Sequence, residues 1–251
     1  MYRLSIIIPC YNEYSRDNLK ENILQLLRLA EESKIQLIFV DDGSRDETYY
    51  AIHDCLSSLT VFDDMVLSRS VHPHESDYKY VICSYKRNKG KGYAIRTGIK
   101  IATGQYIGYL DADLSVEPQE LLAMCDRADW RKGVIGVRAD FGKRPLYRRL
   151  ATKVVHAIAS AVFKLDCTDT QCGCKVFPAW AMKMSLEHMK CLRWLFDVEL
   201  LCIMQKYNLT IGEQKVQWDN SNNSRLTLRK DLVPTLFELV DLIFRLPTLR
   251  A

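Results

Sequence analysis

The sequence has no apolar run that approaches the roughly 20 residues of a membrane-spanning helix. We therefore expect a chain that does not cross a bilayer. No signal peptide precedes the first apolar segment, which begins almost at Met1, and this predicts a cytoplasmic protein in a reducing compartment.

Paired cysteines are also lacking. The nine cysteines are an odd number, and none has the spacing of a zinc ribbon. Cys167, Cys172 and Cys174 lie close together, so a metal or redox role is the alternative. Cys-x-Cys without a second pair or a histidine favours core or loop thiols.

The sequence also lacks a large excess of basic or of acidic residues. The 35 Lys and Arg residues against 31 Asp and Glu leave a formal net charge of +4 over 251 residues. This balance does not indicate nucleic acid as a partner. The sequence contains no internal repeat, low-complexity tract or linker, so one domain over residues 1–251 is expected.

Short apolar runs alternate with segments of helical spacing through the first half of the chain. Strands are expected at 4–8, 36–40, 80–84 and 106–110, and helices at 18–32, 46–56 and 93–102. This order predicts an α/β fold with a largely parallel sheet, in which ligands bind beyond the carboxyl ends of the strands. Segment 59–79 breaks the pattern and is expected to be a surface insertion, with a site built on its two histidines as the alternative.

Two carboxylates, Asp111 and Asp113, follow the strand expected at 106–110. Period-two alternation points both to one side, and such hard oxygen ligands suit Mg²⁺ or Mn²⁺ bridging a diphosphate. The metal would neutralise the charge of a departing nucleoside diphosphate. A solvated turn is the alternative for Asp-x-Asp alone, but its position after a buried strand favours the metal site.

Asp41 and Asp42 follow the strand at 36–40 in the same way. A carboxylate there can accept a hydrogen bond from a base N–H or a ribose hydroxyl. A helix-capping turn explains Asp42 equally well but explains Asp41 less well. Segment 87–92 precedes a helix with glycines and basic side chains, so it is a candidate for holding phosphate, although it has neither P-loop nor dinucleotide-binding spacing.

The second half of the chain is basic and amphipathic. A helix is expected at 146–163, and segment 138–164 holds seven Lys and Arg residues against one acid. This pattern is typical of a helix on an anionic membrane surface, with a core helix as the alternative. Helices are also expected at 194–207 and 228–246, the latter on the core or on the membrane, and 211–218 alternates like an antiparallel strand.

Four ordered motifs resemble the family 2 glycosyltransferases, and the resemblance covers roughly residues 4–225. The motifs are IPCYNE at 8–13, VDDGS at 40–44, NKGKG at 88–92 and LDAD at 110–113. The resemblance implies a GT-A, Rossmann-like fold with a mostly parallel central sheet. It also implies a nucleotide-sugar-binding half over 1–137 and an acceptor half over 138–251 that has amphipathic, membrane-facing helices.

The same resemblance implies roles for individual residues. The nucleoside pocket is expected to be lined by Pro9, Tyr11, Glu13 and Asp41. Lys91 is expected near the donor, and Asp111 and Asp113 at the diphosphate and the metal, which would be Mg²⁺ or Mn²⁺.

Three later motifs look like the polyprenyl-phosphate branch, closest to the dolichyl-phosphate glucosyltransferases. They read DTQCGCKVF at 169–177, FDVELL at 196–201 and SRL at 224–226. By this resemblance the candidate phosphate contacts are Arg138 and Arg225, the acceptor side has Gln171 and Lys175, and the catalytic face has Asp197 and Glu199. Solvated surface positions are the alternative for Asp197, Glu199 and Arg225.

The implied reaction is inverting transfer of a hexose to a dolichyl or polyprenyl phosphate, with UDP-glucose favoured as donor and GDP-mannose as the alternative. A lipid phosphate is already ionised and needs no strong base, so the metal and Arg225 would supply charge neutralisation. The alternative acceptor is a saccharide or protein hydroxyl, which needs Asp197 or Glu199 as base. A nucleotidyltransferase would instead carry a glycine-rich loop where this chain has 9–13, and intact donor motifs disfavour a non-catalytic binding module.

The sequence departs from the better-known eukaryotic glucosyl enzymes by lacking an amino-terminal anchor and by having Cys174 within the Gln-x-Gly-x-Lys stretch. We therefore expect the basic amphipathic helix to make a peripheral contact with the membrane instead.

Overall fold

The computed structural model describes most of the chain in several stretches. They are residues 1–15, 18–56, 61–63, 78–138, 163–165, 167–218, 235 and 237–245. Arg225, the helix expected at 146–163 except its last residue, and most of segments 59–79 and 138–164 lie outside them. No helix in the described stretches is long and apolar enough to cross a membrane.

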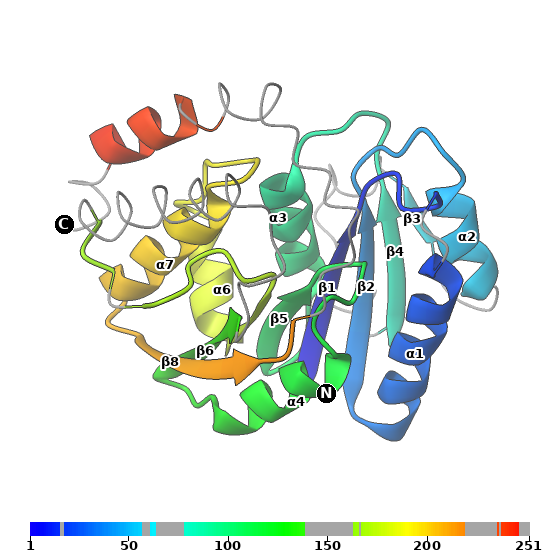
Figure 1. Ribbon diagram of the computed structural model, residues 1–251, viewed down its shortest axis with the longest axis horizontal. Coiled ribbons are helices and arrows are strands. Elements are labelled where there is room, and N and C mark those ends of the chain that lie inside the picture. The colour runs from blue at the N-terminus through cyan, green and yellow to red at the C-terminus, as the bar shows by residue number, and fades with distance from the viewer. Residues whose placement is uncertain are drawn as a thin grey trace.

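The described strands form one eight-stranded sheet with the order β3-β4-β2-β1-β5-β7-β6-β8 (Figure 1). The strands are β1 (Leu4–Cys10), β2 (Ile35–Asp41), β3 (Val61–Asp63), β4 (Tyr80–Ser84), β5 (Tyr106–Leu110), β6 (Lys132–Arg138), β7 (Cys174–Pro178) and β8 (Thr210–Val216). Each neighbouring pair is parallel except the two made by β7, which runs antiparallel to β5 and β6. The predicted mostly parallel α/β sheet is confirmed.

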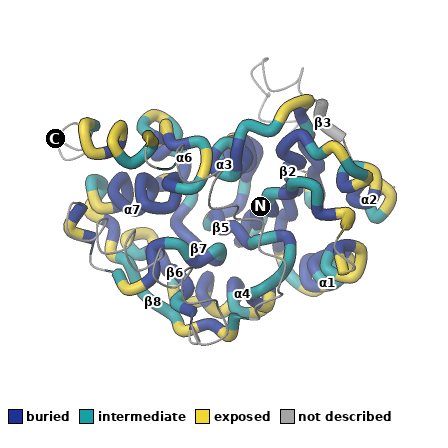
Figure 2. Tube along the Cα trace, turned by 45° about the horizontal axis from the view of Figure 1, so that its top comes forward, coloured by how far each residue is buried: buried dark blue, intermediate teal, exposed yellow. Residues whose placement is uncertain are grey.

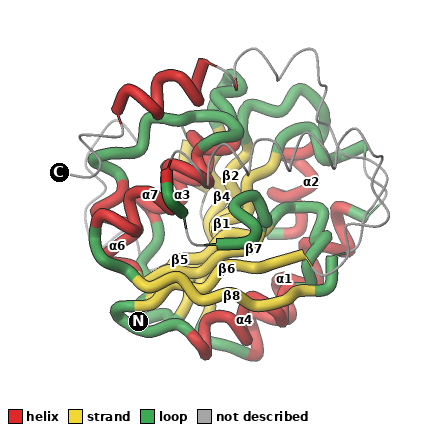
Figure 3. The backbone as a smooth tube through the Cα atoms, turned by 60° about the vertical axis from the view of Figure 1, so that its left-hand side comes forward, coloured by secondary structure: helices red, strands yellow, loops and turns green. Residues whose placement is uncertain are grey.

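Helices cover both faces of this sheet, as Figure 3 shows. One face carries α1 (Leu19–Glu32), α2 (Thr48–Cys55) and α4 (Pro118–Arg127), and the other carries α3 (Lys91–Ile101), α6 (Ala179–Ser185) and α7 (Phe196–Lys206). Alternate residues of β1 serve the two cores, since Ile6 and Ile8 pack on the first face and Ile7 on the second. The central strands β1, β2, β4, β5 and β7 are therefore almost entirely buried (Figure 2), as expected for strands covered on both faces.

The end of the chain adds a helix over residues 237–245. Leu242 of this helix is fully buried in the core that contains α3, α6 and α7, and Leu239 packs against that core. The helix lies over α7 in Figure 1, where it is red. Of the two positions expected for it, packing on the core is therefore observed.

Strand polarity places the functional motifs at one edge. Cys10, Asp41 and Ser84 are register partners at the carboxyl ends of β1, β2 and β4. Because β7 is antiparallel, its first residue, Cys174, pairs with Leu110 at the end of β5. The loop before β7 therefore lies beside Asp111, and one continuous sheet joins the two halves of the chain.

Two local predictions are corrected. The strand expected at 211–218 is β8, and it pairs parallel with β6 rather than antiparallel. Its alternating pattern reflects a half-exposed edge strand and carries no information on direction. The segment expected to be only a surface insertion contributes the edge strand β3, parallel to β4.

Candidate functional site

Asp111 and Asp113 lie in a tight turn directly after β5. Leu114 adopts a positive φ of 47°, and its N–H donates to the Asp111 carbonyl at 3.0 Å. Oδ1 of Asp113 accepts hydrogen bonds from the Ser115 N–H at 3.1 Å and from its hydroxyl at 2.8 Å. The turn thus fixes both carboxylates at the edge of the sheet where the strands end.

Lys91, the first residue of α3, forms an ion pair with this turn. Its Nζ lies 2.5 Å from Oδ1 of Asp111. Burial disfavours the ammonium, but the negative charges of Asp111, Asp197 and Asp113 outweigh burial and raise the pKa of Lys91. Lys91 is therefore a fixed cation beside the two carboxylates.

Gly173 closes the other side of Asp111. A Cβ built on Gly173 would lie 2.0 Å from Oδ2 of Asp111, so a larger residue cannot occupy position 173 without moving that carboxylate. Asp111 is therefore held between the Lys91 ammonium and the Gly173 backbone.

The donor set at this turn fits a hard divalent cation. Within the described stretches no cluster of three or more His, Cys, Asp or Glu residues is placed to bind a metal, so the protein offers the two carboxylates of Asp111 and Asp113. Mg²⁺ is commonly bound through one or two carboxylates together with substrate phosphates. These residues would hold such an ion only when a diphosphate completes its coordination.

Asp41 and Asp42 have different environments. Asp42 accepts hydrogen bonds from Tyr85 Oη at 2.7 Å, Asn88 Nδ2 at 2.8 Å, and the backbone N–H groups of Lys89 and Gly90 at 2.7 and 2.9 Å. Burial raises the pKa of Asp42 despite these donors. Asp42 therefore builds the turn at 88–90.

Asp41 has fewer partners. Its Oδ1 accepts the Ser44 N–H at 3.1 Å, and its Oδ2 accepts the Ser84 hydroxyl at 2.8 Å. Two carboxylate oxygens have about four lone-pair sites. Asp41 can therefore accept further hydrogen bonds from a ligand, whereas the hydrogen bonds of Asp42 stabilise the fold.

The segment after β1 packs against the turn after β2. Asn12, at a φ of 50°, receives the Arg45 N–H on Oδ1 at 2.7 Å, and its own N–H donates to the Ser44 hydroxyl at 2.8 Å. The Glu13 N–H donates to the Thr48 hydroxyl at 2.7 Å. These contacts bring the four expected pocket residues to one edge of the sheet. They are Pro9, Tyr11, Glu13 and Asp41.

Three backbone N–H groups at the amino-terminal end of α3 are already bonded within the protein and are not available to hold phosphate. The Gly92 N–H donates to the Arg193 carbonyl at 3.3 Å and the Tyr93 N–H to the Leu192 carbonyl at 3.0 Å. The Gly90 N–H is bound by Asp42. Of the phosphate-binding features expected in segment 87–92, the basic side chains remain, among them Lys91 beside Asp111.

Asp197 and Lys175 form a buried ion pair. Lys175 Nζ lies 2.5 Å from Oδ1 of Asp197 and donates to the Cys172 carbonyl at 2.7 Å. The Tyr109 hydroxyl donates to the same Asp197 oxygen. Burial, reinforced by Asp197, raises the pKa of Tyr109 well above its ordinary value. The structure thus joins residues that the sequence assigned to separate acceptor and catalytic roles.

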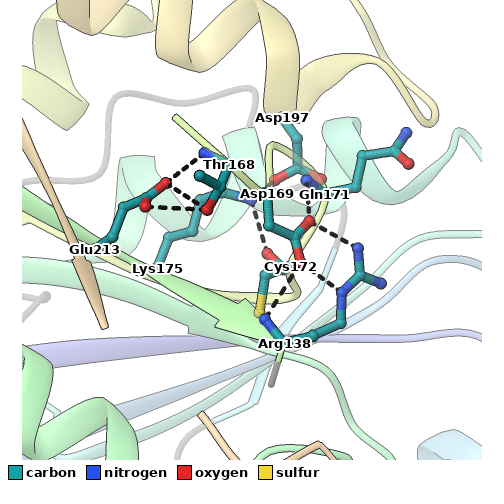
Figure 4. Close-up of polar contacts among 8 residues, drawn as sticks. All are labelled: Arg138, Thr168, Asp169, Gln171, Cys172, Lys175, Asp197 and Glu213. Carbon is teal, nitrogen blue, oxygen red and sulfur yellow. Dashed lines mark hydrogen bonds and ion pairs between the residues drawn. The ribbon is translucent and has the colours of Figure 1, made fainter. Parts of the chain in front are cut away.

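Arg138 forms a second buried ion pair with Asp169, in which the two side chains face each other (Figure 4). Arg138 Nε and Nη2 donate to the two Asp169 oxygens at 2.6 and 2.7 Å, a bidentate geometry. Burial acts against the charge on Asp169, but Arg138 outweighs burial and lowers the pKa of Asp169. The Gln171 N–H donates to Asp169 at 3.1 Å, while its side-chain amide points away from the pair (Figure 4).

Glu199 is fully buried at the start of α7. Its Oε2 accepts the N–H groups of Lys190 and Cys191 at 2.9 and 2.7 Å, and its Oε1 lies 2.6 Å from Nη1 of Arg245. Glu199 therefore connects the loop before α7 with the helix at 237–245. Arg225, the remaining candidate, lies outside the described stretches.

Sequence reasoning missed three residues of this site. They are Tyr109, Asp169 and Gly173. A hydroxyl in the middle of a buried strand signals that Tyr109 needs a polar partner. Asp169 and Gly173 belong to the motif at 169–177, but no local pattern names their partners, which are distant in sequence.

None of the nine cysteines forms a disulfide. Cys172 and Cys174 are fully buried, and burial raises the pKa of the Cys172 thiol to about 11. No metal-binding group includes these thiols within the described residues. Cys172 and Cys174 are therefore core thiols.

Solved structures with the same fold include glucosyl-3-phosphoglycerate synthase from Mycobacterium tuberculosis in complex with Mn²⁺, UDP and phosphoglyceric acid. It matches with a TM-score of 0.67 and 14% identity, over 97% of this chain and 78% of that chain. Another structure of that synthase, with Mg²⁺ and UDP, has a TM-score of 0.65, 14% identity and coverage of 97% of this chain and 78% of that one. The predicted GT-A fold is confirmed, and structural neighbours with this fold bind Mn²⁺ or Mg²⁺.

Relatives by sequence include two dolichyl-phosphate beta-glucosyltransferases. The human protein is 30% identical over 241 residues, which cover 89% of this chain and 69% of that protein. The Dictyostelium discoideum protein is 26% identical over 260 residues, covering 96% and 74%. The family model for glycosyl transferase family 2 matches residues 5–188, a span that contains both aspartate motifs and the loop before β7. The chain therefore belongs to glycosyl transferase family 2 and is close to its dolichyl-phosphate beta-glucosyltransferase branch.

Proposed function

We propose that this chain transfers a glucosyl residue from UDP-glucose to dolichyl phosphate or another polyprenyl phosphate. A phosphate oxygen of the acceptor bonds to C1 of the sugar as the bond from C1 to UDP breaks, and UDP leaves with the electron pair. Direct displacement of this kind inverts the anomeric centre. The names of the sequence relatives support the reaction, and the UDP complexes of the structural neighbours support the nucleotide.

The donor site of this proposal follows the carboxyl edge of the sheet. The nucleoside lies against Pro9, Tyr11, Glu13 and Asp41, and Asp41 accepts from the base or the ribose. The diphosphate lies toward Lys91, Asp111 and Asp113. A Mg²⁺ or Mn²⁺ ion held by the two aspartates would neutralise charge on the leaving diphosphate. Lys91 places a second, permanent positive charge beside it.

The observation that carries the choice of acceptor is the buried ion pair of Asp197 with Lys175. A hydroxyl acceptor needs a base, and Asp197 would have to leave both Lys175 and the Tyr109 hydroxyl to serve as one. Glu199 is held by Arg245 and two backbone N–H groups. A phosphate acceptor needs no strong base. We therefore assign Asp197, Lys175 and Glu199 positioning roles.

The acceptor half is proposed to be 138–251 and the donor half 1–137. Gln171 and Arg225 are proposed to face the acceptor phosphate, while Arg138 supports that side through Asp169. The helix at 237–245 exposes Phe237, Val240 and Phe244, which are 73%, 51% and 79% exposed at helical spacing. This outer apolar face supports peripheral contact with a membrane, where a lipid phosphate is found.

A transfer assay tests the proposal. Purified protein is incubated with Mn²⁺ or Mg²⁺, a short polyprenyl phosphate and radiolabelled UDP-glucose or GDP-mannose, and lipid-extractable label is counted. We expect product from UDP-glucose to form at least about tenfold faster than from GDP-mannose. Asp113→Ala should lower this rate by about a hundredfold or more.

Asp54→Ala is the matched control, because it removes a carboxylate that is 73% exposed on α2. It should leave the rate unchanged. Faster transfer from GDP-mannose would show that the donor is GDP-mannose and not UDP-glucose. Failure to bind any nucleotide sugar would contradict the proposed function as a whole.

A further inference from the structure

The helix at 237–245 holds the loop that precedes α7 through one carboxylate. Oε1 of Glu238 accepts the N–H groups of Leu192 and Arg193 at 3.0 and 2.8 Å, and Oε2 accepts the N–H of Leu195 at 3.2 Å. Hydrogen bonds to an ionised acceptor are among the stronger ones in proteins. Glu238 therefore fixes the backbone of residues 192–195 from a helix more than forty positions away in the sequence.

The same loop covers the amino-terminal end of α3. The carbonyls of Leu192 and Arg193 accept the N–H groups of Tyr93 and Gly92. The contact is backbone against backbone, since a Cβ on Gly90 would lie 2.4 Å from the Leu192 carbonyl oxygen. Leu192 and Arg193 thus each donate an N–H to Glu238 and accept an N–H from α3 through the carbonyl.

Lys91 lies between the loop at 192–195 and the turn that contains Asp111. It is the first residue of α3, its Nζ is paired with Asp111, and the same Nζ lies 5.6 Å from the centre of the Phe196 ring just after the loop. A shift of the loop would therefore move the residue whose cation faces Asp111.

We propose that Glu238 is a positioning residue for Lys91, acting through the loop at 192–195 and the first turn of α3. This inference rests on the proposed function, in which Lys91 stabilises the leaving diphosphate. Through Glu238, the helix at 237–245 would influence the donor site, although this helix itself lies over α7.

Glu238→Gln tests the link with almost no change of shape. The amide nitrogen places a donor against backbone N–H groups that need an acceptor, so the loop loses part of its fixation. We expect kcat for sugar transfer to fall about tenfold with KM for the donor changed by less than about threefold, because a misplaced group acts mainly on the transition state. Glu238→Asp, which keeps the charge, should recover part of the rate.

A double-mutant cycle with Lys91→Met separates positioning from general destabilisation. If Glu238 acts through Lys91, Glu238→Gln should lower kcat by less than about twofold once Lys91 is absent. Asp241→Asn is the matched control, since it removes an exposed carboxylate from the same helix whose partner is Arg245. It should leave kcat within about twofold of the unsubstituted protein.

Amide hydrogen exchange gives a readout that does not depend on activity. Glu238→Gln should speed exchange at Gly92 and Tyr93 by about tenfold, while Asp241→Asn should not. Equal loss of kcat in both Lys91 backgrounds, or unchanged exchange at these two amides, would overturn the positioning role. Faster exchange in a protein that transfers no sugar would keep the link to α3 and contradict the proposed function instead.

Discussion

The ammonium of Lys91 lies 2.5 Å from Oδ1 of Asp111, joining the first residue of α3 to the residue that follows β5. This contact links the glycine-rich segment at 88–92 and the Asp-x-Asp motif, which are separate in the sequence. It places one positive and two negative side-chain charges at the carboxyl edge of the sheet, where a diphosphate and a divalent cation can share them.

Lys91→Met should lower kcat/KM for the donor by about a hundredfold, because it removes the permanent cation beside the leaving group. The loss is measured as initial rates of sugar transfer over a range of UDP-glucose concentrations. Lys100→Met, at an exposed position on the same helix, is the control and should retain full activity. A Lys91→Met rate within about threefold of the unsubstituted protein would show that Lys91 only pairs with Asp111.

Gly173→Ala should impair the site with little loss of stability. The new methyl group would lie 2.0 Å from Oδ2 of Asp111, so the carboxylate must rotate away. We expect the Mn²⁺ concentration for half-maximal activity to rise about tenfold. Gly212→Ala is the control, since its Cβ would meet the flexible end of the Lys132 side chain. Unchanged Mn²⁺ dependence in Gly173→Ala would mean that Asp111 is not a metal ligand.

Asp41→Asn and Asp42→Asn should separate binding from folding. Asp42→Asn puts an amide against four donors and should lower the free energy of unfolding by about 2 kcal/mol. Asp41→Asn should weaken UDP binding by about tenfold with a smaller change in stability. Calorimetric titration with UDP and urea unfolding of both variants check this. The reverse pattern would exchange the roles of the two residues.

The strands and helices of residues 4–56 and 80–110 were predicted well from the sequence because their signals are local, whereas α4 and β6 were not predicted. The apolar runs of β4 and β5 end at polar residues, so their bounds at 80–84 and 106–110 are confirmed. The Asp-x-Asp turn follows directly from the position of β5. By contrast, β7 was not predicted as a strand, because Lys175 interrupts its apolar run and the Asp197 that neutralises this charge belongs to a different element.

The partners of buried charges could not be predicted for the same reason. Asp41 and Asp42 are adjacent and chemically identical, and only the packing of the turn at 88–90 shows which one serves the fold. Glu238 and Glu199 meet their partners through tertiary contacts with the loop before α7. The spacing of residues along the chain does not reveal which side chains form such pairs.

Asp169→Asn should change the dependence of stability on pH. Asp169 has a pKa below its ordinary value of 3.8: burial opposes its charge, and Arg138 outweighs burial. For an acid with a lowered folded pKa, the stabilisation is fully present above the unfolded value and is lost as the pH falls through the folded value. At neutral pH the variant should be destabilised by about 3 kcal/mol, since Arg138 remains buried and unpaired.

Urea unfolding from about pH 7 to about pH 3 measures this difference, which should shrink below about pH 4. Asp126→Asn, which removes the exposed partner of Arg3, is the control and should cost less than about 1 kcal/mol. A difference between Asp169→Asn and the unsubstituted protein that stays constant over the whole range would show that folding does not lower the pKa of Asp169.

The choice between a phosphate and a hydroxyl acceptor is tested most directly by offering two lipids that differ only in the phosphate. Purified protein is given UDP-glucose, Mn²⁺ and either a polyprenyl phosphate or the corresponding polyprenol, and lipid-linked glucose is measured for the unsubstituted protein and for Asp197→Asn. We expect product from the polyprenyl phosphate alone, with Asp197→Asn retaining measurable transfer because Asp197 is not a base. Product from the polyprenol, or complete loss of transfer in a folded Asp197→Asn protein, would contradict the assignment of a lipid phosphate as acceptor.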